Sequence, residues 1–352
     1  MLTSDLVVSD PNSDGIFIAT APVTIDLNGF EIRGPVSCTG LGSTLSCGAG
    51  TGRGIRAEGR PRITVVNGSV IQFGSDGILV ASRSRIDGVV VERNGGDGVR
   101  TGADSLVTNV RSYRNAGDGI DVGDSSTVKL CTSASNGQNG VLTGTAALVS
   151  ESTARDNGTN GVLIFSRTVV SKVVASGNEE VGISGSTGCT IQDSSTYDNG
   201  SVGIFSNTAS SILRNTSTGN AVHGIRATRT SLIMGNVASA NGESGIEAVF
   251  DRSVVGNQIV ENLGFGLRLR ESTTYRDNTI MENTLGGIEN FVGASPPGVD
   301  LGGNYCAGPL RRDLDTPVRL RRGVGRVALG HESRRLLVLT MDACNFGARA
   351  LR

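Results

Sequence analysis

A glycine recurs every 21 residues through most of this chain, from Gly77 to Gly287. An aliphatic residue follows each of these glycines, and an asparagine stands four places before all but the first, from Asn94 to Asn283. The spacing holds without a single insertion. A register kept over so many repeats means that each repeat is one turn of a solenoid, stacked on the turn before it.

Each repeat contains three short apolar segments. Counted from the glycine, positions 1 and 3 are apolar or small, as in Val162 and Ile164, and position 9 is Ile or Val from Ile86 to Val254. Positions 12 and 14 form the third segment. Alternation of this kind is typical of strands with one buried face. The sequence therefore predicts an all-β, single-stranded parallel β-helix of about 11–13 turns, with three short strands per 21-residue turn and like-numbered residues stacked ~4.8 Å apart.

The asparagine and glycine columns are interpreted as scaffold. Asparagine tolerates the left-handed backbone of a corner, and its amide can bond to the turns above and below. A second asparagine column, from Asn215 to Asn278, is expected to do the same at position 12. The glycine supplies either a special conformation or a close approach that a side chain would prevent.

The two ends depart from the repeat. Residues 1–53 are predicted to form an N-terminal cap and the first turns, with a small insertion in which Cys38 and Cys47 can pair. Residues 54–307 form the β-helix. Residues 308–352 are an arginine-rich tail, for which three interpretations stay open: a C-terminal cap, a basic binding arm, or a frame-shifted reading of a GC-rich gene.

Composition excludes some partners. No run of 18 apolar residues is present, so no membrane span is predicted. Outside the tail acidic residues outnumber basic ones, which gives no reason to expect a nucleic acid partner.

The repeat closely resembles the right-handed parallel β-helix proteins of the pectate-lyase-like superfamily. The stretches VTIDLNGFEIRG (Val23–Gly34) and RITVVNGSVIQF (Arg62–Phe73) look like the first turns of bacterial members. The resemblance covers roughly residues 2–307. It implies export to the periplasm or the outside, with a signal peptide missing from this chain. It leaves function open, because the superfamily includes lyases, hydrolases, epimerases and phage tailspikes.

In superfamily enzymes the substrate commonly lies in a groove along one strand face. The matching strand here is expected around position 9, whose outward residues, beyond Arg85 and Asp87, include no carboxylate. Glycosidic hydrolysis usually needs two acids. The Asp-Pro-His motif of the mannuronan epimerases is absent, as are the clustered aspartates and the histidine of the polygalacturonases. These absences argue against an enzyme of those kinds.

Acidic residues stack just before the glycine in the early turns. Asp76, Asp97 and Asp118 occupy this position, and Asp121 lies on the next strand. Stacked carboxylates repel one another unless a cation or a substrate sits between them, and calcium suits oxygen ligands. The four residues are therefore candidate calcium ligands. The alternative is an ordinary Asp-Gly corner facing water.

Arginine and tyrosine gather at positions 13 to 16 of neighbouring turns. An Arg–Tyr group can neutralise a uronate and take a proton. We consider Arg111 and Tyr113, together with Asp97 and Asp118, as candidate catalytic residues, and Glu92, Arg114 and Arg155 as candidate substrate-binding residues. The alternative is that these side chains are ordinary solvent-exposed residues on the surface of a rod.

The leading hypothesis is an exported β-helix protein that engages extended polysaccharide along its side without established turnover. A structural or adhesive surface rod is the first alternative. A polysaccharide lyase or hydrolase using Asp97, Asp118 and Arg111 is the second. No cofactor other than calcium is expected.

Overall fold

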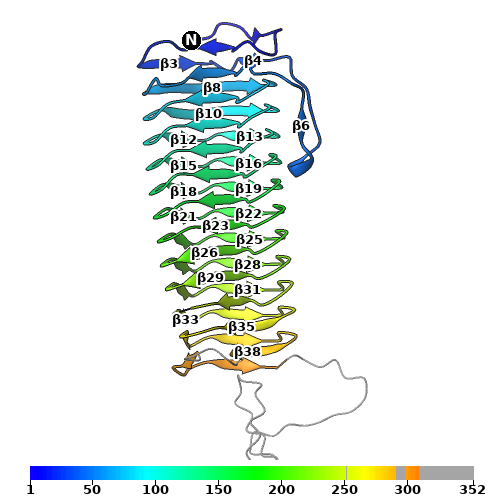
Figure 1. Ribbon diagram of the computed structural model, residues 1–352, viewed down its shortest axis with the longest axis vertical. Coiled ribbons are helices and arrows are strands. Elements are labelled where there is room, and N and C mark those ends of the chain that lie inside the picture. Colours follow the sequence, from blue (N-terminus) through cyan, green and yellow to red (C-terminus); the bar gives the residue numbers. More distant parts are fainter. Residues whose placement is uncertain (251, 291–297, 309–352) are drawn as a thin grey trace, which may run out of the picture.

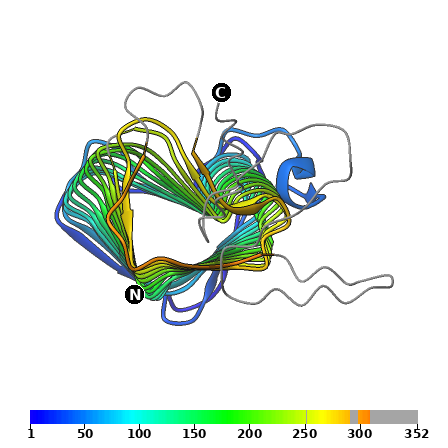
Figure 2. The same cartoon turned by 90° about the horizontal axis from the view of Figure 1, so that it is seen from below.

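The chain forms a straight rod of stacked coils, in a computed structural model that describes residues 1–250, 252–290 and 298–308 (Figure 1). Seen from the end, the coils superimpose as a ring. A short segment from the early part of the chain, coloured blue, lies outside this ring (Figure 2). The alternatives for the arginine-rich tail concern residues that, except Gly308, lie outside the described part.

One strand of every turn belongs to a sheet of thirteen parallel strands within the described residues, which we call sheet B. Its strands follow the repeating glycine. In order they are β2 (Ile16–Phe17), β7 (Ile55–Ala57), β9 (Ile78–Val80), β11 (Val99–Thr101), β14 (Ile120–Val122), β17 (Val141–Thr143), β20 (Val162–Ile164), β23 (Ile183–Gly185), β26 (Ile204–Thr208), β29 (Ile225–Arg229), β32 (Ile246–Ala248), β35 (Phe265–Leu269) and β38 (Gly286–Asn290).

The other two strands of each turn belong to a bent sheet, sheet A, which has 25 strands among the described residues. The first column holds β3 (Val23–Asp26), β12 (Leu106–Thr108), β15 (Thr127–Lys129), β18 (Leu148–Ser150), β21 (Val169–Ser171), β24 (Thr190–Gln192), β27 (Ser211–Leu213), β30 (Leu232–Met234), β33 (Ser253–Val255), β36 (Thr274–Arg276) and β39 (Val299–Asp300).

The second column holds β1 (Leu6–Val7), β4 (Glu31–Arg33), β13 (Arg111–Tyr113), β16 (Thr132–Ala134), β19 (Thr153–Arg155), β22 (Val174–Ser176), β25 (Ser195–Tyr197), β28 (Thr216–Thr218), β31 (Val237–Ser239), β34 (Gln258–Val260), β37 (Thr279–Met281) and β40 (Tyr305–Ala307). Two longer strands, β8 (Ile63–Ile71) and β10 (Arg85–Glu92), pass through both columns. The predicted fold is confirmed: an all-β parallel solenoid of about eleven regular turns.

Aliphatic residues stack along the inside of the rod because the register between turns is 21 residues throughout the repeat. Ile86 faces Val107, which faces Val128, and all three are fully buried. Each such side chain stabilises the fold by about 1.5–3 kcal/mol through burial. The core is therefore a set of continuous columns rather than a globular cluster.

The predicted asparagine ladder is present. Asn115 donates from Nδ2 to Oδ1 of Asn136, at 3.1 Å, and the same oxygen accepts the backbone N–H of Asn115 at 3.0 Å. The second column, from Asn215 to Asn278, makes equivalent bonds. One expectation was wrong: the left-handed corner is not at the asparagine but at the residue before it, such as Arg114, with φ 52°. The asparagine therefore serves the ladder through its hydrogen bonds and not through a left-handed backbone.

The repeating glycine is required for close approach. Gly119 has no positive φ, so its conformation is open to any residue. A Cβ built there would overlap the Ser133 hydroxyl and lie 2.6 Å from Nδ2 of Asn136. Of the two roles proposed for this column, the structure supports the second.

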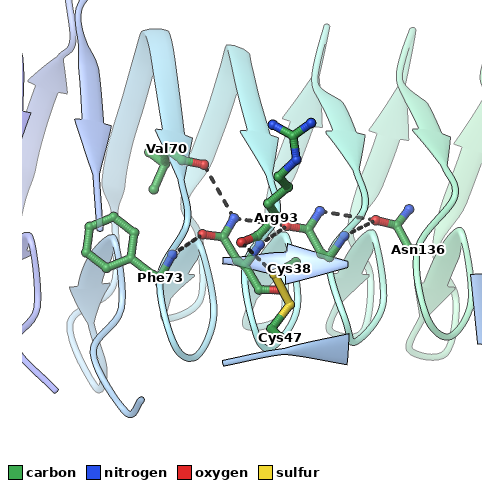
Figure 3. Close-up of a disulfide and its surroundings, with 8 residues drawn as sticks. Cys38, Cys47, Val70, Phe73, Arg93 and Asn136 are labelled. Carbon is green, nitrogen blue, oxygen red and sulfur yellow. Dashed lines mark hydrogen bonds between the residues drawn. A yellow bond between two sulfur atoms is a disulfide. The ribbon is translucent and has the colours of Figure 1, made fainter. Parts of the chain in front are cut away.

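A short hairpin projects from the early turns and runs down the side of the rod (Figures 1 and 2). It contains β5 (Cys38–Thr39), the 3₁₀ turn η1 (Gly42–Thr44) and β6 (Ser46–Cys47). The expected Cys38–Cys47 disulfide closes it, next to the asparagine ladder (Figure 3). Cys131 and Cys189 are buried free thiols.

Candidate functional site

The outer face of sheet B carries one outward side chain per turn in a straight line. The strand registers place the following residues in this line, which we call the outer column: Phe17, Arg56, Leu79, Arg100, Asp121, Leu142, Leu163, Ser184, Phe205, Arg226, Glu247, Arg268 and Glu289. Charged residues lie toward both ends and apolar residues lie in the middle. Successive members are ~4.8 Å apart along the rod.

Near the N-terminal end, the outer column meets the predicted stack of aspartates. Asp76, Asp97 and Asp118 lie one residue before the glycine, beside sheet B, and each uses one carboxylate oxygen to hold the next turn. Oδ1 of Asp76 accepts the N–H of Asp97 at 3.0 Å, and Oδ1 of Asp97 accepts the N–H of Asp118 at 2.7 Å. We call Asp76, Asp97, Asp118 and Asp121 the acid cluster. Its first three members form a ladder parallel to the asparagine ladder.

The second oxygens of this cluster face arginines. Arg100, about half exposed, lies between two acids, with Nη1 3.6 Å from Oδ2 of Asp97 and Nε 3.2 Å from Oδ2 of Asp121. Arg53 lies 3.1 Å from Oδ2 of Asp76. No ion pair reaches Asp118, whose hydrogen bonds within the described residues are in the ladder, chiefly to Asn139. The four acids outnumber these two arginines.

Burial raises the pKa of Asp97, Asp118 and Asp121, and repulsion between carboxylates adds to the shift at Asp97 and Asp121. Burial, reinforced by the charges of Asp118, Asp76 and Asp121, raises the pKa of Asp97 to about 7. Burial also raises the pKa of Asp121 to about 6, although Arg100 opposes the shift. The pKa of Asp118 is raised by burial as well, against the hydrogen bonds from Asn139. A carboxyl that titrates near neutral pH can both accept and donate a proton there.

The calcium prediction stays a proposal. Within the described residues no three acidic, histidine or cysteine side chains converge on a point where an ion could be held. The ladder geometry explains this, since Asp76 and Asp97 each commit one oxygen to a backbone N–H. Calorimetric titration with calcium tests the proposal: binding heat and a raised melting temperature support it, and the absence of both contradicts it.

The predicted Arg–Tyr group lies on the outer face of sheet A. Tyr113 stacks on Glu92 across β10 and β13, and Ala134 separates Tyr113 from Arg155. Arg111 is exposed on the same strand as Tyr113. Arg111 and Tyr113 thus lie on sheet A, whereas Asp121 and the strands that follow Asp97 and Asp118 belong to sheet B.

A second charged cluster lies near the C-terminal end of the outer column and was not predicted as a site. Its centre is Glu247, which points outward yet is only 2% exposed. We call Glu247 and its surroundings the glutamate cluster. Oε2 of Glu247 lies 2.8 Å from Nε of Arg226 and 3.2 Å from Nε2 of His223, and Oε1 lies within 4 Å of Arg268 and Arg270.

The backbone fixes the tautomer of the histidine. The N–H of Ser244 donates to Nδ1 of His223 at 3.2 Å, so the ring proton is on Nε2 and faces Glu247. Burial raises the pKa of Glu247, but the hydrogen bond from His223 and the charges of Arg226 and Arg270 outweigh it, and the pKa falls to about 2. Glu247 is therefore a permanent anion at neutral pH.

The two clusters use equivalent positions of the repeat. His223 occupies the position of Asp76, Asp97 and Asp118, and Glu247 occupies that of Asp121. The sequence analysis expects the substrate groove along the residues that flank position 9, and these residues lie on sheet A. The available signal was position 2, where the outward residues of sheet B change from apolar to charged toward both ends.

The middle of the outer column is apolar. Leu142, Leu163 and Phe205 are partly exposed there, and Phe165, two residues beyond Leu163, is 48% exposed. These side chains connect the acid cluster to the glutamate cluster along one face. Together the three segments make a continuous strip of outward groups on sheet B.

The sequence matches the family model for the right-handed β-helix region over residues 3–169, 101–231 and 140–285. No curated protein matches it. Among the described residues, no helix is long and apolar enough to cross a membrane.

Several solved structures are similar to this chain at low identity. A mutant of the periplasmic alginate epimerase AlgG is 15% identical, with 72% of this chain and 75% of that chain covered and a TM-score of 0.48. The A-module of a mannuronan C-5 epimerase from Azotobacter vinelandii is 14% identical, with 82% and 91% covered and a TM-score of 0.46. The catalytic unit of an α-1,3-glucanase from Streptomyces thermodiastaticus is 16% identical, with 85% and 63% covered and a TM-score of 0.44. At these identities the likeness concerns the fold alone. Because the family model covers most of its length, the chain belongs to the right-handed β-helix family.

Proposed function

We propose that the protein binds an extended polysaccharide along the outer face of sheet B. The observation that carries this proposal is the outer column itself, which lines up charged and apolar groups along the rod. Leu163 and Phe165 can pack against the apolar C–H faces of sugar rings, and arginines can pair with acidic substituents. A linear polymer parallel to the rod axis contacts all of these groups at once.

Acid–base turnover of the bound polymer is a second candidate function, favoured by one observation. Asp97, with a pKa of about 7, lies beside Arg100, and Arg100 also contacts Asp121. In this proposal Arg100 neutralises a uronate carboxylate and Asp97 takes the proton from the adjacent carbon. The electron pair of that C–H bond forms a C=C bond as the glycosidic C–O bond breaks, and the leaving oxygen takes a proton from Asp118. Asp118, whose second oxygen has no ion-pair partner among the described residues, is available as the other acid–base group.

A binding panel tests the first proposal. Polygalacturonate and neutral dextran are titrated into the wild-type protein, Arg100→Gln and Phe165→Ala, with Arg214→Gln and Leu130→Ala as controls. Arg214 and Leu130 are comparably exposed but lie at corners of sheet A. We expect at least a tenfold loss of affinity in the sheet B variants and no change in the controls. Equal binding by all variants contradicts the proposal, and no binding together with self-association favours the structural rod.

Turnover is tested on the same polymers by following unsaturated products and new reducing ends. We expect product release by the wild-type protein to be lost in Asp97→Asn while binding persists. Binding without any product leaves polysaccharide engagement as the function and removes the lyase and hydrolase alternative.

We also propose that the protein is exported. The Cys38–Cys47 disulfide supports this, because disulfides persist mainly in oxidising compartments. Fractionation of cells that make the protein tests it, and a purely cytosolic, reduced protein contradicts it.

A further inference from the structure

The tip of the disulfide hairpin is held against the rod, far from the point where the hairpin leaves the rod. We call residues 35–52 the flap. At its tip, the backbone N–H of Ser43 donates to Oε1 of Glu179 at 2.9 Å, across 136 residues of sequence. Gly158, which has no side chain, lets the backbone at Ser43 approach closely. Near its base, the sulfur of Cys38 lies 3.1 Å from the carbonyl oxygen of Arg93. The flap is therefore fixed at both ends.

A cavity of about 540 Å³ lies between the flap and the rod. The flap contributes Cys38, Thr39, Leu41 and Leu45 among its lining residues, and the rod contributes Arg93 and Arg114. A volume of this size is within the range of small-molecule sites, roughly 300–1,000 Å³. The cavity is open to solvent. Its flap side combines the apolar Leu41 and Leu45 with the polar Thr39 and Thr44, and its rod side is cationic. It is separate from sheet B, because both arginines occupy the corner that follows the second column of sheet A.

The two arginines are stacked and incompletely neutralised. They occupy the same corner position of adjacent turns, so their backbones are ~4.8 Å apart. Arg93 pairs with Glu92 at 3.2 Å. The guanidinium of Arg114 forms no hydrogen bond or ion pair with any described residue, although it is partly buried. An anion placed between the two arginines relieves their repulsion and can accept a bidentate pair of hydrogen bonds from Arg114.

We propose that the flap cavity binds a small organic carboxylate of the sugar-acid class. The carboxylate lies at Arg114 and Arg93, and the carbon skeleton lies under Leu41 and Leu45, with the Thr39 hydroxyl available to a ligand hydroxyl. An inorganic anion makes no contact with Leu41, Leu45 or the threonines, which is why an organic ligand with hydroxyl groups fits better. The disulfide keeps the flap in place beside the two arginines, so the site depends on the oxidised flap.

The test is calorimetric titration of the full chain with galacturonate, with galactose as the neutral counterpart and with sulfate. The variants are Arg114→Gln and the double variant Cys38→Ser/Cys47→Ser, and the control is Arg83→Gln, an exposed corner arginine outside the cavity. Melting curves verify that every variant is folded. We expect galacturonate to bind and galactose not to bind, and we expect affinity to fall at least tenfold in Arg114→Gln and in the cysteine variant but not in Arg83→Gln.

Three outcomes overturn the proposal: equal binding of galactose, unchanged affinity in Arg114→Gln, or binding of sulfate without binding of galacturonate. The result is independent of polymer binding on sheet B. Polymer affinity is measured through Arg100→Gln, which does not line the cavity, so either proposal can fail while the other stands.

Discussion

Asp97 donates its backbone N–H to Asp76 at 3.0 Å and accepts the N–H of Asp118 on its own carboxylate at 2.7 Å. The same side chain reaches Arg100 with its other oxygen. A candidate acid–base group is thus also a rung of the scaffold. Its carboxylate is placed by the turns on either side, and its high pKa follows from that placement.

Replacing Asp97 with asparagine should stabilise the protein at pH 8. The amide retains an oxygen for the N–H of Asp118, as Asn160 does for Val181 in the same column at 3.3 Å. It removes a buried charge next to two other carboxylates. We expect a gain on the order of 1 kcal/mol after solvent screening, measured by thermal unfolding.

The stabilisation should depend on pH in a definite direction. The pKa of Asp97 is about 7 in the folded chain and about 3.9 when unfolded, so the folded state binds more protons between these values. Wild-type stability therefore falls as pH rises from about 4 to about 7, and the advantage of Asp97→Asn grows over the same range. A constant difference across this range contradicts the raised pKa.

Removing one rung of the asparagine ladder should be costly. Oδ1 of Asn157 accepts both the N–H and the Nδ2 group of Asn136, and its own Nδ2 donates to Asn178. Asn157→Ala leaves several buried polar groups unsatisfied, each costing about 1–3 kcal/mol. We expect a loss of at least ~3 kcal/mol in denaturant unfolding. Asn109→Ala is the control, because Asn109 is exposed and, among the described residues, its side chain bonds only to Asp87.

Glu247→Ala should be among the most destabilising changes on the outer face. It removes the buried anion shared by His223, Arg226, Arg268 and Arg270, and breaking a buried pair in this way costs about 3–5 kcal/mol. Glu243→Ala is the matched control, since Glu243 is 54% exposed and contacts the same histidine at 3.4 Å. Similar melting temperatures for the two variants contradict a central role for Glu247.

The pH dependence of this cluster is opposite to that of Asp97. The pKa of Glu247 is lowered to about 2, so its stabilisation is complete above its unfolded value, about 4.3, and is lost as pH falls toward about 2. The wild-type protein should therefore lose its stability advantage over Glu247→Ala in acid. Melting curves of both proteins between pH 2 and pH 6, chosen to span roughly these two values, measure the effect.

The repeat predicted the fold because a 21-residue period determines which residues stack. The sequence alone pairs Asn115 with Asn136, and Cys38 with Cys47 across their short loop. The glutamate cluster was harder to predict. In the sequence, Glu247 is only one variable outward position. Its burial depends on arginines from the two neighbouring turns, which surround it together. The flap contact was beyond sequence reasoning, since nothing in the repeat links Ser43 to Glu179.

That contact provides the last prediction, a pH-dependent release of the flap. Hydrogen bonds from Ser43 lower the pKa of Glu179, so the contact is complete above the unfolded pKa and is lost as pH falls through the lowered folded pKa. We expect the Ser43 amide to exchange with deuterium faster in Glu179→Ala at pH 7, and wild-type protection to disappear in acid. Glu180→Ala is the control, because the neighbouring Glu180 side chain forms no bond within the described residues. Unchanged exchange in Glu179→Ala would mean that the disulfide and Gly158 hold the flap without the carboxylate.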